Sequence, residues 1–331
     1  MHLFSSCFHF RALLYKSVKF GIPNAWEELT PELFEGIMGD MDLVTKGKLS
    51  PGMLQVKHVC RAMRWDPRLL ARAKDEETLS NLAWLGEQVD FIFRVTYPDQ
   101  DAALQDLSKD DFIKAKKTPP ERLNLPIARY LSKLDYKFVL NSCFCVQLIP
   151  YVSIQGKLYP GYSIDTGFNQ LTCSLTALQF IEARSLLGCN KEMLPLLAAI
   201  LYHPGPYDSE SAHTLAKSFE RLSSETLQSI AFNFSSFVNY LFSKTQFRIL
   251  VAGESEKKSL ITTGALESLY NLSNDGLGDI STVEQMNLIK YLTILRKKLI
   301  EAVQSMGSAE MPVVDIAKNT GLPISLIKQI I

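Results

Sequence analysis

The stretch SESAHTLAKSFERLSSETLQSIAFNFSSFVNYLF, residues 209–242, decides the fold class of this chain of 331 residues. In its second half, apolar residues recur at intervals of three and four, which places them on one side of a helix: Ile230, Phe234, Phe237 and Leu241. Two apolar segments upstream have the same character, and they stop at helix-ending signals, Gly188 and Pro204. The sequence therefore predicts a mainly α, multi-helical fold.

Further helices are expected on both sides of this region. Thr30 followed by Pro31 is typical of a helix start, with Leu33, Phe34 and Ile37 on its buried face and Trp26 packed before it. A helix is also expected over 79–93, where Leu82, Leu85, Val89 and Phe93 recur at helical spacing. A long helix is expected over 281–307, with Thr282 as N-cap and Gln285 as its capping partner.

Residues 138–162 form the clearest β segment, because they are rich in β-branched and aromatic residues and contain a turn signal at Gln155-Gly156. Cys143 and Cys145 lie in this segment, two residues apart. They could be half of a metal site, but no second Cys or His pair has the spacing that structural zinc needs. We therefore expect two thiols on one core face of a strand.

A change of composition marks the expected domain boundaries. Residues 99–122 are rich in charge and contain a Pro-Pro pair, as in a solvated connector. This divides the chain into an N-terminal helical unit (1–98), the connector (99–122), a central helical domain with a short β segment (123–306), and a C-terminal hairpin (307–331).

Composition and motifs argue against several classes of function. Lys plus Arg and Asp plus Glu both number 35, so no global electrostatic attraction to nucleic acid is expected. No apolar run approaches the length of a membrane span. No phosphate-binding loop, dinucleotide-binding motif or zinc-protease helix occurs, and His203 and His213 lack an accompanying nucleophile motif. The sequence thus predicts a non-enzymatic protein with no cofactor and no metal.

The aromatic residues of 232–242 have two interpretations. Exposed aromatic side chains mark interfaces, which makes a set of them candidates for binding a protein partner: Phe232, Phe234, Phe237 and Tyr240. At helical spacing, however, such a stripe is more often part of a core, and that interpretation is favoured.

The block from 170 to 237 resembles phage and prophage proteins of Bacteroides-type bacteria. The likeness rests on Leu175-Thr176-x-x-Gln179-Phe180-Ile181-Glu182, on the apolar helix 197–202 closed by Pro204, and on Tyr207-Asp208 before two further helices. Upstream, residues 22–30 resemble the opening of the same proteins. The resemblance implies a role in tail or virion assembly through a protein partner or self-association, in the cytoplasm of a bacterial host or in the virion.

The last residues, DIAKNTGLPISLIKQII (315–331), resemble a DNA-reading helix-turn-helix. Ala317, Gly321, Ile327 and Ile330 occupy the places that the packing of this motif requires. The groove-facing positions carry little charge and are the candidate DNA contacts: Lys318, Ser325, Lys328 and Gln329. Because affinity for DNA comes mainly from Lys and Arg on phosphates, a DNA-binding regulator is the alternative, and a hairpin packed on protein is favoured.

Overall fold

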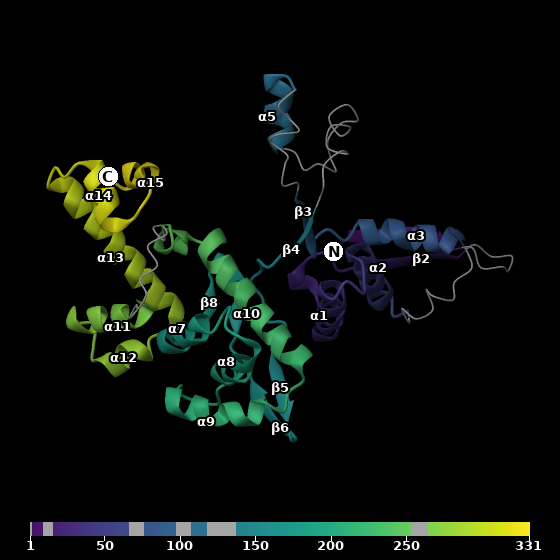
Figure 1. The fold of residues 1–331 in the computed structure, drawn as a ribbon, viewed down its shortest axis with the longest axis horizontal. Coiled ribbons are helices and arrows are strands. Elements are labelled where there is room, and N and C mark those ends of the chain that lie inside the picture. Colours follow the sequence, from purple (N-terminus) through teal and green to yellow (C-terminus); the bar gives the residue numbers. More distant parts are fainter. Residues whose placement is uncertain (1, 9–15, 66–75, 97–106, 118–136, 253–263) are drawn as a thin grey trace. The chain divides into compact units, whose positions relative to one another are not determined.

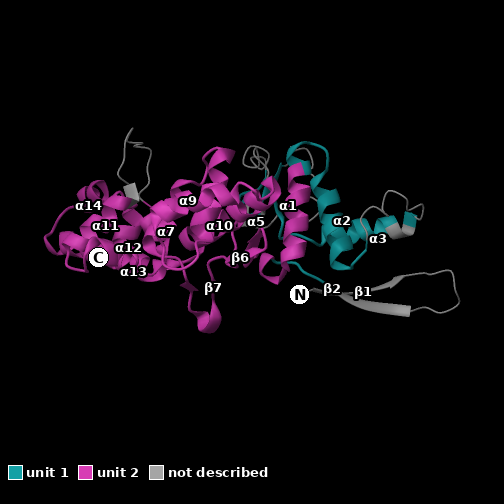
Figure 2. Ribbon diagram, turned by 90° about the horizontal axis from the view of Figure 1, so that it is seen from below, with its two compact units in different colours: residues 1–25, 43–141 teal, residues 26–42, 142–331 magenta. Residues whose placement is uncertain are grey.

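The computed structural model of the chain describes residues 2–8, 16–65, 76–96, 107–117, 137–252 and 264–331. Within these ranges the protein is mainly α with a small β segment, so the predicted fold class is confirmed (Figure 1). The described residues divide into two compact units, coloured separately in Figure 2: unit 1 comprises 1–25 and 43–141, and unit 2 comprises 26–42 and 142–331. These units differ from the predicted divisions in that residues 26–42 belong with the second half of the chain.

The described residues of unit 1 form two small antiparallel pairings and three helices. The elements are β1 (His2–Phe8), β2 (Lys16–Ile22), α2 (Pro51–Ala62), α3 (Glu76–Glu87), β3 (Phe93–Thr96), α5 (Lys109–Lys117) and β4 (Lys137–Leu140). β1 pairs with β2, and β3 pairs with β4. Of the predicted connector, residues 107–117 are described and end in the exposed helix α5, whereas 99–106 and 118–122 lie outside the described residues.

The helix expected over 79–93 ends earlier, at Glu87. Leu82 and Leu85 are buried on α3 as predicted, but Phe93 begins β3. Side-chain amides cause the change, because they bind backbone groups that would continue the helix. Asn24 donates to the Gln88 carbonyl at 3.1 Å and accepts from the Asp90 N–H at 3.2 Å.

A neutral histidine lies in the core of unit 1. The His58 side chain is fully buried, and its Nε2 is 3.1 Å from the Pro23 carbonyl oxygen. Burial lowers the pKa of His58 below its ordinary value of 6.5, since a charged ring would lose its hydration. The neutral ring is therefore the form that this core accommodates.

Unit 2 is a helical body with two short hairpins, and α10 runs through its centre (Figure 1). Its elements are η1 (Trp26–Glu28), α1 (Pro31–Thr45, of which 31–42 belong to this unit), β5 (Tyr151–Ile154), β6 (Lys157–Pro160), β7 (Ile164–Asp165), η4 (Gly167–Asn169), β8 (Thr172–Cys173), α7 (Ala177–Ser185), η5 (Lys191–Met193), α8 (Leu194–Leu201), α9 (Ser209–Phe219), α10 (Ser224–Lys244), η6 (Gln246–Leu250), α11 (Gly264–Asn274), α12 (Ile280–Glu284), α13 (Leu288–Ser308), α14 (Val313–Thr320) and α15 (Ile324–Ile330).

The helix starts of unit 2 follow from their capping residues. Thr176 Oγ1 accepts from the Gln179 N–H at 3.2 Å, and Gln179 Oε1 accepts from the Thr176 N–H at 3.2 Å, which completes a capping box for α7. The Ser223 hydroxyl caps α10 by accepting from the Thr226 N–H at 3.1 Å. The predicted starting helix α1 is also present, and Phe34 and Ile37 are fully buried on it.

The prediction of one long helix over 281–307 is wrong, because the helix is interrupted between α12 and α13. Asp279, and not Thr282, caps α12, with its Oδ1 2.8 Å from the Thr282 nitrogen. Asn287 then caps α13 and donates through Nδ2 to the Cys173 carbonyl. The break is stabilised by two backbone hydrogen bonds to the entry of α7, at 2.8 and 2.9 Å, so the freed polar groups are satisfied.

Between β4 and β5, residues 141–150 have no regular secondary structure, although strands were predicted there. The predicted turn at Gln155-Gly156 does join two strands, β5 and β6. Cys143 and Cys145 consequently do not share a strand face: Cys145 is buried and Cys143 is half-buried, 3.4 Å from Ser243 Oγ. Burial raises the pKa of Cys145 to about 12, so this thiol remains protonated.

A side chain of α10 and the residue that follows α8 bind backbone groups of this irregular segment. Asn233, 1% exposed, donates to the Val146 carbonyl at 2.7 Å and accepts from the Leu148 N–H at 2.8 Å. The Tyr202 hydroxyl donates to the Ile149 carbonyl at 2.6 Å. An irregular segment can be buried only when its polar groups find such partners.

Replacing Asn233 by Asp tests this bond pair. The carboxylate can accept from Leu148 but cannot donate to Val146, and it would be a buried charge, so we expect a loss of at least about 3 kcal/mol in the free energy of unfolding. Asn239→Asp is the matched control, since Asn239 is exposed and donates to Ser142 at 2.9 Å. Urea unfolding measures both; an equal loss in the two variants would contradict the assigned role.

Candidate functional site

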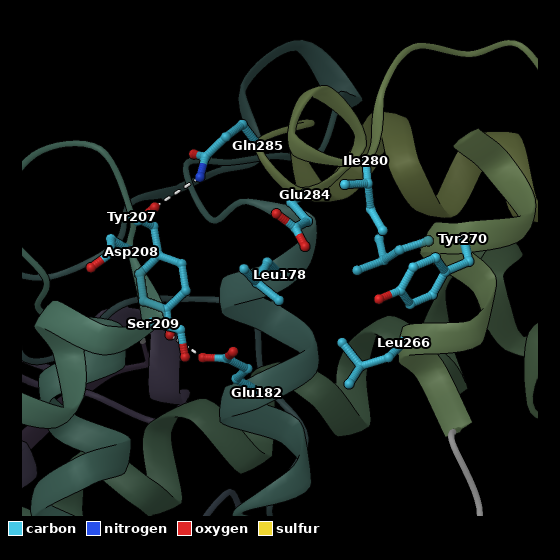
Figure 3. A pocket seen from close by; sticks show the side chains of 11 residues that line it. Leu178, Glu182, Tyr207, Asp208, Ser209, Leu266, Tyr270, Ile280, Glu284 and Gln285 are labelled. Carbon is cyan, nitrogen blue, oxygen red and sulfur yellow. Dashed lines mark hydrogen bonds between the residues drawn. The ribbon is translucent and has the colours of Figure 1, made fainter. Parts of the chain in front are cut away.

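A pocket of about 370 Å³ lies between α7, α11, α12 and the loop before α9 (Figure 3). Each of the three helices contributes a pair of side chains that are four residues apart and therefore lie on one face, and α11 also contributes Leu269. The pairs are Leu178 and Glu182 on α7, Leu266 and Tyr270 on α11, and Ile280 and Glu284 on α12. The loop contributes residues 207–209. We refer to this site as the acidic pocket.

Hydrogen bonds fix the loop side of the acidic pocket. Gln285 donates through Nε2 to the Tyr207 carbonyl at 2.8 Å, and the Tyr207 hydroxyl donates to Glu182 (Figure 3). Asp208 caps α9 by accepting from the Ser211 N–H at 2.7 Å. The loop is thus tied to α7, to α9 and to the end of α12.

Electrostatically, the pocket is negative. Three of its lining residues are carboxylates, Glu182, Asp208 and Glu284, and none of the lining residues is Lys or Arg. Glu284 is the last residue of the short helix α12. Burial, followed by the hydrogen bond to Glu182, raises the pKa of Tyr207, so its hydroxyl remains a neutral donor.

The opposite wall is apolar and partly open to solvent. Leu269 is buried, whereas Leu266 and Tyr270 are 45% and 60% exposed. In Figure 3 the Tyr270 ring and the Leu266 side chain extend from α11 toward the hollow that faces α7. A hollow with an apolar wall and a polar rim can hold one extended side chain of another molecule.

The residues considered for catalysis do not form part of this pocket. His203 Nε2 lies 2.6 Å from Ser211 Oγ, and the His203 ring packs edge-on against Tyr207. His213 is exposed and does not line the pocket. In the described part of the chain, no three His, Cys, Asp or Glu side chains gather in a way that could hold a metal ion.

A second exposed feature is the Phe168 loop, residues 166–171, which connects β7 to β8 and projects from unit 2 (Figure 2). The Phe168 side chain is 103% exposed. Its backbone is in the left-handed region, with φ 54° and ψ 30°, and Asn169 follows with φ 57°. A bulky residue rarely adopts this conformation, so the loop displays the ring in solvent at a cost in strain.

Of the four predicted partner-binding aromatics, two are fully buried in unit 2 and two, Phe232 and Tyr240, are half-buried. Phe234 and Phe237 are fully buried, and Phe232 packs against Trp26 with ring centroids 5.5 Å apart. Tyr240 is half-buried. Phe234 and Phe237 therefore belong to the core, as helical spacing favoured, and present no surface to a partner.

The C-terminal hairpin is present and packs on its own chain. Gly321 ends α14 in the left-handed conformation, with φ 72°, and its N–H donates to the Ala317 carbonyl at 2.8 Å. Ile316, Leu322 and Ile327 are buried against Val303 of α13 and Ile249 of η6. The apolar spacing of 315–331 thus makes a small core of its own.

The candidate DNA contacts lie on the outside of this hairpin. Lys318 Nζ is 3.5 Å from Asp315 Oδ1, and Lys328 is exposed. Ser325 and Gln329 line a hollow of about 260 Å³ together with Arg248 of η6. Within the hairpin, therefore, several unpaired basic side chains do not lie together on one face of α15.

Sequence reasoning did not find the acidic pocket. Its residues come from three separate segments, 178–182, 207–209 and 266–285, and the break at 285–287 that orients α12 had been predicted as continuous helix. The one available signal was Tyr207-Asp208, which the family resemblance included without a role.

No protein-family model, no curated protein and no solved structure matches this chain. None of the described helices is both long enough and apolar enough to cross a membrane. Function must therefore be inferred from the pocket and the exposed loop.

Replacing Phe168 by Gly tests whether the exposed ring contributes to the stability of the protein. The exposed ring contributes no burial, and glycine relieves about 1–2 kcal/mol of left-handed strain, partly offset by the flexibility of glycine in the unfolded chain. We expect a free energy of unfolding that is unchanged or up to about 1 kcal/mol higher. Urea unfolding measures it, with Phe219→Ala, a buried position, expected to lose about 3–5 kcal/mol. A loss above about 1 kcal/mol in the glycine variant would show that the ring packs on the protein.

Proposed function

We propose that this chain is a non-enzymatic protein that acts in phage or prophage tail or virion assembly by binding another protein. The observation that carries the proposal is the acidic pocket, where Leu266 and Tyr270 expose apolar surface beside a hollow of about 370 Å³. Exposed apolar surface at the rim of a hollow is typical of sites that bind another molecule. The resemblance of residues 170–237 to phage assembly proteins favours a protein as that molecule.

The Phe168 loop supports the same function. Aromatic side chains are enriched among the residues that dominate protein interfaces, because they bury a large area with few rotatable bonds. A ring that is fully exposed and held by strained backbone would become buried only in a complex. The two features lie on separate elements of unit 2, so a partner could use either or both.

Photocrosslinking at position 270 tests the proposal. Tyr270 is replaced by p-benzoylphenylalanine, and the chain is expressed together with the products of the genes that flank its own. We expect one protein to crosslink at position 270, and Leu178→Trp, which fills the pocket, to abolish the crosslink. The matched control is the same replacement at Tyr151, which is also 60% exposed but lies on β5 outside the pocket. Equal crosslinking at both positions, or none at 270, would contradict the proposal.

The alternative is a DNA-binding regulator that uses α14 and α15. The observation in its favour is the packing of this hairpin, which has the left-handed glycine and buried branched residues of a helix-turn-helix. Against it, Lys318 and Lys328 are the only residues that supply positive charge within the hairpin, and Lys318 is already paired with Asp315.

A gel-shift assay at low salt distinguishes this alternative. Because the hairpin has so few basic side chains to neutralise phosphates, we expect no stable shift of duplex DNA. A shift that disappears when Lys318 and Lys328 are both replaced by Ala, but persists when the exposed Lys217 and Lys244 are replaced, would establish the regulator and overturn the proposed function.

A further inference from the structure

We propose that the acidic pocket recognises a cationic side chain, lysine or arginine, carried on the surface of the bound protein. This inference rests on the proposed function and adds the chemistry of the group that enters the pocket.

Charge complementarity is the first argument. The lining residues include three carboxylates and no Lys or Arg. Asp208 is already bound as the N-cap of α9, so the two carboxylates that remain for a ligand are Glu182, in the last turn of α7, and Glu284, at the end of α12. Figure 3 shows Glu284 extending into the hollow from the α12 side and Glu182 lying on the α7 side. A cation between them would remove the mutual repulsion of like charges in a partly enclosed space.

The apolar wall is the second argument. Lysine and arginine carry their charge at the end of a flexible aliphatic stem, which packs along apolar surface while the head remains polar. Leu178, Leu266 and Ile280 line the hollow and can cover such a stem. The exposed Tyr270 ring can also stack on a cationic head, an interaction that a neutral or anionic group would not make.

The Tyr207 hydroxyl prepares the site for this ligand. It donates to Glu182 and thereby fixes the position of one carboxylate, while the Glu182 oxygens keep acceptor capacity for a second donor. A small metal ion fits less well, because no group of three ligating side chains converges in the described residues. A hollow of about 370 Å³ with apolar lining residues fits an organic cation better than a point ion.

Methyl-detected NMR of the full chain tests the inference with two probes of equal length, n-butylammonium chloride and n-butanol, at constant ionic strength. We expect the ammonium ion to shift the methyl signals of Leu178, Leu266 and Ile280 saturably, and the alcohol to bind at least about tenfold more weakly. Glu182→Gln and Glu284→Gln should each weaken ammonium binding by about three- to fivefold, the effect expected for one partly solvated ion pair. Glu220→Gln, which removes an exposed carboxylate outside the pocket, should leave binding unchanged.

Equal binding of the alcohol and the ammonium ion, or binding that Glu284→Gln and Glu182→Gln leave unchanged, would overturn the inference. The crosslink at position 270 separates this failure from failure of the proposed function. If the crosslink forms while the probes show no preference for charge, a protein binds the pocket and the cation assignment is wrong. If the probes show the preference while no protein crosslinks, the pocket is selective for cations, and protein binding is wrong.

Discussion

The amide of Asn233 is the interaction on which unit 2 most depends. Its two hydrogen bonds hold residues 146–148, of which Leu148 is buried, and which are part of neither a helix nor a strand. Such a segment cannot satisfy its own backbone, so the central helix α10 must supply a group that both donates and accepts. With this segment fixed, β5 and β6 follow directly, and Phe144 is placed in the aromatic cluster around Trp26.

The elements that could be predicted from sequence are those defined by local chemistry. Thr176 and Gln179 form a capping box within four residues, and Gln155-Gly156 turns a hairpin of adjacent strands, so each is readable from a short window. The break before Asn287 was not readable in this way. It exists because Cys173, Leu175 and Ala177, more than a hundred residues earlier, provide its hydrogen-bond partners. The same tertiary contact orients α12, which explains why the pocket could not be predicted.

The functional proposal rests on surface that the core does not use. Phe234 and Phe237 looked like candidates for a partner but fill the interior of unit 2, whereas Phe168 and Tyr270 are exposed and had attracted no prediction. The distinction depends on which aromatics the fold covers, and hydrophobic periodicity alone does not determine this. At the C-terminus, the apolar pattern did determine the packing of α14 and α15, and the sparse charge remained the argument against DNA.

Hydrogen–deuterium exchange tests the central claim, that unit 2 binds a protein through the acidic pocket, most directly. Exchange would be compared in the free chain and in its complex with the protein that crosslinks at position 270. The account predicts slower exchange in the end of α7, in residues 205–209 and in α11 and α12, with α14 and α15 unchanged. Protection confined to α14 and α15, or spread evenly over unit 2, would contradict it.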